Sequence, residues 1–258
     1  MRPGRAPFLL PLILVAIGVV LLLHNFGMIQ DFDPVAYWPV LLILAALQLL
    51  FRSDLGLTWH AQTFGITRGT VQTATLEANS GELDVKIRAL RREGRLIAGQ
   101  YTGRSRPDLD VRGDHARLTM QRGRAWPFSH ADWEIGLAKD LPWMLALSAH
   151  LGELDIDLRG LHITRADLAT GIGDVRVIAS ETVRDGIRAR SALGNVTLTV
   201  PLDVEAVVRV VPEPLARLQI DETRFLMLEP GLYATLGYEQ GSPVFAEVRT
   251  TLGMVRLQ

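Results

Sequence analysis

LATGIGDVRV, residues 168–177, is one of five copies of a ten-residue pattern that decides the fold. Each copy places aliphatic residues two and four positions after a glycine, and Ala, Thr or Ser stands three positions before it. Alternating aliphatic residues are typical of β-strands, and glycine permits the backbone geometry of a tight corner. The pattern therefore predicts a strand, a corner and a second strand. The other copies are LEANSGELDV (76–85), LSAHLGELDI (147–156), ARSALGNVTL (189–198) and VRTTLGMVRL (248–257).

The spacing of the copies predicts how they stack. The corner glycines are Gly81, Gly152, Gly173, Gly194 and Gly253, and the middle three are 21 residues apart. A fixed period is typical of a solenoid, in which each coil packs on the next and buries a shared apolar stripe. An ordinary β-sandwich, which is the alternative, would not require equal spacing. We therefore predict a mainly β fold, with a β-solenoid-like domain over 71–258 after a linker over 53–70.

Two long apolar runs precede this domain. They read FLLPLILVAIGVVLLL (8–23) and VAYWPVLLILAALQLLF (35–51). Both runs approach the length that crosses a bilayer as a helix, so we predict a transmembrane helical hairpin within 1–52, with spans at about 8–25 and 35–51. A cleaved signal peptide is the alternative for the first run, but no small-x-small cleavage site follows it. A buried helical hairpin of a soluble domain is a further alternative.

Basic residues near these runs predict their orientation. Arg2 and Arg5 precede the first run and Arg52 follows the second, whereas the loop between the runs holds two aspartates and no Lys or Arg. Positively charged flanks tend to stay on the cytoplasmic side of a membrane. We therefore expect a multi-pass protein of the cell membrane with both termini in the cytoplasm.

The charge of the chain is close to zero overall but unevenly distributed. A formal net charge of −1 argues against a dedicated nucleic-acid-binding protein, and the lack of cysteine excludes a disulfide framework and a cysteine-ligated metal site. Residues 86–124, however, contain eleven basic and four acidic side chains, a net charge of +7. Such a stretch attracts anionic lipid headgroups or an acidic partner. A solvated strand face or an arginine-rich coding bias would look the same. The candidate contact residues are Arg88, Arg91, Arg92, Arg95, Arg104 and Arg106.

The sequence contains few signs of catalysis. Glu153, Asp155 and Asp157 alternate along one predicted strand and so share a face, as paired acid–base carboxylates would. Like charges at this spacing are more often a solvated strand face. None of the six histidines forms a metal-binding HExxH motif, no GxSxG motif surrounds a serine, and no nucleotide-binding glycine loop is complete. We expect a protein that is not an enzyme and that binds no metal and no cofactor.

Two parts of the chain resemble known families. LLLHNFGMIQDFDPVAYWPVLLILAALQLL (21–50) resembles the transmembrane region of LiaF-like and LiaI-like bacterial membrane proteins, with Asn25, Gly27, Trp38 and Pro39 at the matching positions. The ATGIGDVRV-type repeats resemble the toastrack-type β-solenoid domain that often follows. This resemblance implies a membrane-anchored accessory protein of the cell-envelope stress response. In LiaF-like proteins that role is typically inhibition of a membrane histidine kinase.

These observations lead to three hypotheses about function. The first is a regulatory interaction module, whose hairpin lies in the lipid bilayer and whose β domain contacts a sensor kinase, another envelope protein or lipid headgroups. The second is a self-assembling scaffold, since a final strand at 255–257 would leave an open edge for a homo-oligomer. The third, an envelope hydrolase, rests only on the aligned carboxylates.

Overall fold

The computed structural model describes residues 61–258 with four gaps, at 92, 103–106, 122–131 and 239–242. These residues belong to the second of two compact units, His60–Gln258. The predicted hairpin and its orientation lie outside the described residues. Within the described ranges, no helix has the length and apolarity that crossing a membrane requires.

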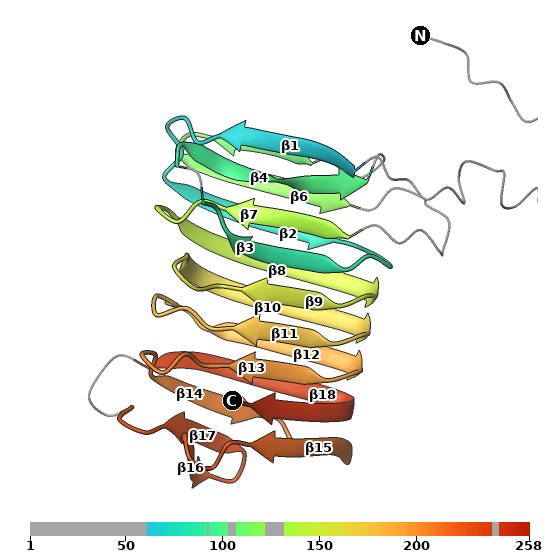
Figure 1. The fold of residues 1–258 in the computed structure, drawn as a ribbon, viewed down its shortest axis with the longest axis vertical. Helices are drawn as coiled ribbons and strands as arrows, with labels where there is room; N and C mark the ends of the chain where they lie inside the picture. Colours follow the sequence, from blue (N-terminus) through green and yellow to red (C-terminus); the bar gives the residue numbers. More distant parts are fainter. Residues whose placement is uncertain (1–60, 92, 103–106, 122–131, 239–242) are drawn as a thin grey trace, which may run out of the picture. The chain divides into compact units, whose positions relative to one another are not determined.

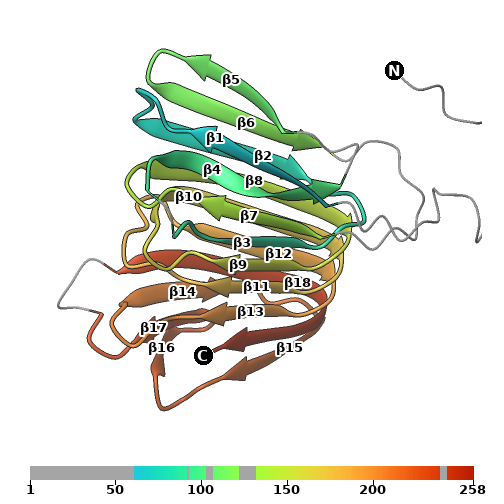
Figure 2. The same ribbon diagram turned by 45° about the horizontal axis from the view of Figure 1, so that its top comes forward.

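The described chain is a mainly β, solenoid-like fold built from 18 strands. The strands form two layers that we call A and B, and each coil of the chain passes from one layer to the other (Figures 1 and 2). In the central coils, strands of successive coils pair in parallel, as in a solenoid.

The A layer contains ten strands in spatial order, counting β18, which crosses into both layers. These are β5 (Asp108–Arg112), β6 (His115–Gln121), β2 (Thr73–Asn79), β8 (Pro142–Leu151), β10 (His162–Ile172), β12 (Ile187–Leu193), β18 (Val244–Leu257), β14 (Ala206–Val210), β17 (Leu232–Thr235) and β16 (Phe225–Glu229).

The B layer is formed by the other eight strands and the second half of β18. In spatial order these are β1 (Ala61–Thr67), β4 (Arg95–Thr102), β7 (Trp133–Leu137), β3 (Val85–Ala89), β9 (Leu154–Asp157), β11 (Val175–Ile178), β13 (Val196–Thr199), β18 and β15 (Leu215–Ile220).

The core lies between the two layers because the central strands, such as β8, β10 and β12, alternate buried and exposed residues. Leu168 of β10 and Val177 of β11 are typical, at 2% and 1% exposure. Trp133 and Trp143 are the largest fully buried side chains. The predicted 21-residue period is the coil length, since Leu168 of β10 pairs with Ala189 of β12 and with Leu147 of β8.

The corner glycines stack in a column. Gly173, Gly194 and Gly253 have φ angles of 144°, 150° and 148°, which side chains other than glycine rarely adopt. A Cβ atom on any of the three would overlap the carbonyl group of the glycine one coil earlier. At the base of the column, a Cβ atom on Gly152 would lie 2.6 Å from the carbonyl oxygen of Leu83. Close approach and φ together require glycine at 173, 194 and 253, and close approach alone requires it at 152.

The structure also shows why Thr or Ser stands three positions before a corner glycine. Thr170, Ser191 and Thr250 are buried, and each donates its hydroxyl hydrogen bond to the carbonyl of the corner glycine one coil earlier, at 3.0, 2.8 and 2.7 Å. These bonds join consecutive coils from inside the core. The repeated pattern is thus a set of inter-coil contacts.

Two expectations need correction, and one corner glycine lies apart from the others. Gly81 lies at the corner between β2 and β3 as predicted, with a φ of 64°. It is outside the glycine column, however, because the pairing of Val85 with Leu154 places Leu83 beside Gly152. Strand β1 falls inside the predicted linker, because Ala61–Thr67 pairs with β4, so the β domain begins before residue 71.

The open edge expected at 255–257 is also wrong. Strand β18 lies between β12 and β14 in the A layer and between β13 and β15 in the B layer. The strand that ends the B layer is therefore β15, whose residues occur earlier in the sequence.

Candidate functional site

Three of the six candidate arginines meet on the outer surface of the B layer. Arg88 lies on β3, Arg95 begins β4, and Arg91 lies in the turn between the two strands. All three side chains are exposed. The other three, Arg92, Arg104 and Arg106, lie outside the described residues.

These arginines border a hollow of about 520 Å³, which we call the arginine hollow. Its floor is made of residues with little or no side chain, since Ala98 of β4 pairs with Gly136 of β7 on one side and with Gly65 of β1 on the other. Two larger side chains lie on this floor, that of Leu90 over Gly136 and that of Arg95 over Gly65. The hollow is lined by Thr63, Phe64, Arg88, Ala89, Leu90, Arg91, Arg95, Ala98, Gly99, Gln100, Glu134, Ile135 and Gly136.

The hollow is positively charged. It is lined by three guanidinium groups and one carboxylate, that of Glu134. Arg88 makes a long ion pair with Asp155, in which Nη2 and Oδ2 are 3.5 Å apart. Neither Arg91 nor Arg95 has an ion-pair partner among the described residues. Guanidinium groups without a carboxylate partner are suited to binding the carboxylate or phosphate of another molecule.

The three aligned carboxylates occupy the adjoining surface of the B layer, and each has an arginine partner. Glu153 pairs with Arg176 at 2.6 Å, Asp155 with Arg88, and Asp157 with Arg159 at 2.6 Å. The hydrogen bond from Arg159 lowers the pKa of Asp157.

A general acid needs the opposite, a pKa raised toward neutrality. The three carboxylates therefore have the features of surface ion pairs and not those of acid–base catalysts. No group of three His, Asp or Glu side chains within the described ranges is placed to hold a metal ion.

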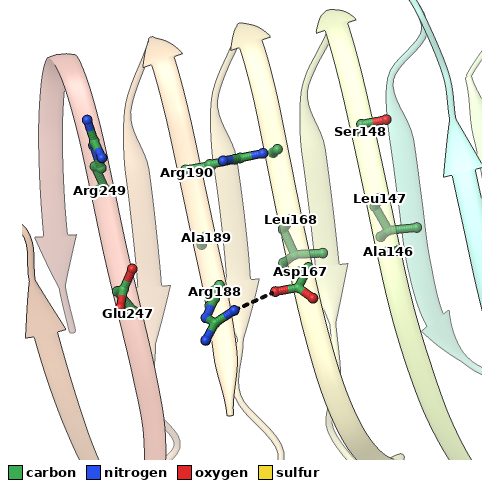
Figure 3. A pocket seen from close by; sticks show the side chains of 11 residues that line it. Ala146, Leu147, Ser148, Asp167, Leu168, Arg188, Ala189, Arg190, Glu247 and Arg249 are labelled. Atoms are coloured by element: carbon green, nitrogen blue, oxygen red, sulfur yellow. Dashed lines mark ion pairs between the residues drawn. The ribbon is translucent and has the colours of Figure 1, made fainter. Parts of the chain in front are cut away.

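A second hollow, of about 450 Å³, lies on the outer surface of the A layer (Figure 3). Asp167 of β10 and Arg188 of β12 are register neighbours and form an ion pair at 3.8 Å. Arg190 points across β10 toward β8. Sequence reasoning missed this site, although the 21-residue period places Asp167 beside Arg188 and could have indicated it.

Comparison with known families identifies the β domain. Residues 63–200, just over half of the chain, match the model for the N-terminal domain of toast_rack, DUF2154. The chain belongs to the toast_rack N-terminal domain family. Residues 8–50 match the LiaI-LiaF-like transmembrane region, which places this toast_rack protein at a membrane. The resemblance seen in the sequence is thereby confirmed.

One solved structure supports this fold. A candidate cell adhesion protein from Clostridium sporogenes ATCC 15579 superposes with a TM-score of 0.65 at 15% identity, covering 76% of this chain and 97% of that one. A candidate adhesin from Bacteroides fragilis NCTC 9343 gives a TM-score of 0.32 at 11% identity, covering 78% of this chain and 98% of that one. No curated protein matches the sequence. The first likeness shows the fold alone.

Proposed function

We propose that this toast_rack protein is a non-enzymatic, membrane-anchored accessory protein of the bacterial cell-envelope stress response. It acts by binding, and its partner is a membrane sensor kinase or another envelope protein. The β domain makes the contact and no covalent chemistry is involved. The LiaI-LiaF-like region and the toast_rack domain together support an envelope-stress protein.

One observation carries the proposed contact. Arg88, Arg91 and Arg95 line the same hollow, and the last two have no ion-pair partner among the described residues. An arginine that served only to solvate a strand face would gain from a neighbouring carboxylate, as Arg176 and Arg159 do. We therefore assign the arginine hollow to carboxylate groups of the partner protein.

The experiment is a pull-down of the tagged full-length chain from native membranes under envelope stress. The test variant carries Arg88→Gln, Arg91→Gln and Arg95→Gln. The matched control carries the same change at Arg112, Arg184 and Arg209, which are exposed arginines elsewhere on the domain. Three exposed charge contacts of about 0.5–1 kcal/mol each predict a loss of at least about tenfold in recovered kinase for the test variant alone.

Several outcomes would contradict the proposal. Equal recovery of the partner protein with both variants would show that the arginine hollow is not part of the interface. Recovery of no sensor kinase or envelope protein by the wild-type chain would count against the regulatory function itself. Anionic phospholipid enriched in the absence of any protein would reassign the hollow to lipid headgroups.

A further inference from the structure

Four strands end the two layers, among those that the structure describes. They are β5 and β16 in the A layer and β1 and β15 in the B layer. An edge strand offers unpaired backbone N–H and C=O groups to any other strand, and natural proteins protect such edges with charged residues or bulges. The edges of this fold differ in that protection.

Three of these edges are protected. Strand β5 has the sequence DLDVR and carries the charged side chains of Asp108, Asp110 and Arg112. Strand β16 has an irregularity in its pairing between Met227 and Glu229. Strand β1 has one at Ile66 and Thr67. Each feature disfavours regular pairing with a further strand.

Strand β15 lacks these features. It pairs with β18 over all six of its residues, Leu215–Ile220, without a register shift, and Arg217 is its one charged residue. Among the described strands it pairs only with β18, so its other side has no strand partner. It is therefore a regular and weakly charged edge.

The core is also uncovered at this edge. Residues paired across parallel strands share a face, so Leu218 points to the core side together with its partner Val255. Val255 is 1% exposed, whereas Leu218 is 45% exposed. The difference arises because Val255 lies between two strands of the B layer and Leu218 has a neighbour on one side only.

The backbone of β15 is oriented for pairing. Asp221, which follows the strand, donates its N–H to the carbonyl of Leu257 in β18 at 3.1 Å. Backbone groups of consecutive residues in a strand point alternately to its two sides. The N–H and C=O groups of Leu218 and Ile220 therefore point away from β18, into the space beyond the edge.

We propose that β15 pairs with β15 of a second copy of this chain, antiparallel and centred on Leu218. In this register Leu218 faces Leu218 of the second copy on the core side, and Ala216 faces Ile220. Arg217 faces Gln219 on the outer side. A register centred on Arg217 would place two like charges opposite each other, which is unfavourable. The Leu218 register joins the two B layers into one sheet through a two-fold axis.

The size of the contact determines the conditions under which the dimer forms. One pair of six-residue strands buries less surface than the roughly 1,200–2,000 Å² of a stable interface. Two chains in the same membrane, however, meet at a raised effective concentration. The dimer therefore forms in membranes and dissociates when the protein is diluted in detergent.

The lack of cysteine in the chain permits a direct test. The full-length Leu218→Cys variant is treated in native membranes with a short bismaleimide. Opposed residues of a hydrogen-bonded antiparallel pair have Cα atoms about 5.5 Å apart, within reach of the reagent. We expect a covalent dimer at a yield at least about tenfold above that of the control, Val111→Cys on the β5 edge. The two positions are matched in exposure, at 45% and 47%.

A second pair of variants tests the register and replaces the first if Leu218→Cys fails to fold. Copies with Arg217→Cys and copies with Gln219→Cys, expressed together, should cross-link more than either copy alone. Equal yields from Leu218→Cys and Val111→Cys would indicate random collision and overturn the proposal. Absence of a dimer at both positions would also overturn it. A cross-link from Leu218→Cys to a different protein would assign the edge to that partner. None of these results depends on the sensor-kinase function.

Discussion

At the scale of single residues, the corner glycines are the positions that tolerate substitution least. Gly194 illustrates this, because its φ of 150° and the carbonyl of Gly173 above it each exclude a side chain. Gly160 has a φ of 67° but open space where a Cβ atom would lie. The two glycines therefore separate the cost of backbone strain from the cost of steric overlap.

We predict that Gly194→Ala destabilises the fold far more than Gly160→Ala. Strain at a positive φ costs about 1–3 kcal/mol, and only Gly194→Ala adds an overlap with backbone atoms that cannot move aside. Urea unfolding of the full chain in detergent, followed by tryptophan fluorescence, measures both. Equal midpoints for the two variants would contradict the stacked column.

The ion pair of Asp157 and Arg159 predicts a dependence on pH. Arg159 lowers the pKa of Asp157 in the folded state, so the pair contributes stability above the pKa of the unfolded state, about 3.9, and loses it as pH falls further. Arg159→Gln should therefore lower the unfolding midpoint at pH 7, and its effect should shrink as pH falls through the lowered pKa of Asp157 in the folded state. The Arg112→Gln control involves an ion pair that is more exposed. A difference between variant and wild type that stayed the same from pH 7 down to acid unfolding would contradict the assignment.

At the scale of elements, the hydroxyl contacts are what hold one coil to the next from within the core. Ser191 is 3% exposed and Thr250 0% exposed, and the carbonyl groups that they bind belong to the glycine column. Removing the hydroxyl leaves a buried carbonyl without that donor. The cost of such a loss is about 1–3 kcal/mol.

We predict that Ser191→Ala and Thr250→Val each destabilise the domain by about 1–3 kcal/mol. Thr197→Val, which changes a half-buried threonine of β13, is the matched control and should have a smaller effect. The measurement is again the urea midpoint in detergent. If the control lost as much stability as the other two variants, the hydroxyl contacts would be unimportant.

Much of this element structure could be predicted from the sequence, because it repeats. The period of 21 residues predicted the coil length, and the glycines predicted the corners. The role of the hydroxyl was not predicted, because its acceptor lies 18 residues earlier and only stacking brings the two together. Gly81 lies outside the column because the strand register on both sides of its corner aligns Leu83, two residues later, with Gly152.

The candidate site was predictable only in part. Arg88, Arg91 and Arg95 are close in sequence, so their common charge was evident. The hollow that they border depends on Ala98 and Gly136, which come from strands β4 and β7 and carry no chemical signal of their own. A depression made by small side chains appears only when the strands are paired.

At the scale of the whole molecule, the place of β18 could not be inferred from the repeats. Its pattern matches the other copies, which suggested a final coil at the end of the stack. The structure instead inserts it between coils that are already consecutive in sequence, since β14 follows β13 in the chain but pairs with β18. A strand that arrives late in sequence thus completes both layers.

This insertion bears on how the protein is made. Coils from β8 to β13 can stack as they leave the ribosome, because each pairs with the coil before it. Strands β14 and β15 cannot take their places until β18 is present between them and the stack. Until synthesis reaches Leu257, the nascent chain exposes the edges of β12 and β13, which are open to misassembly with other chains. Completion of both layers therefore waits for β18, which is synthesised after every other described strand, and the edges of β12 and β13 stay open until then.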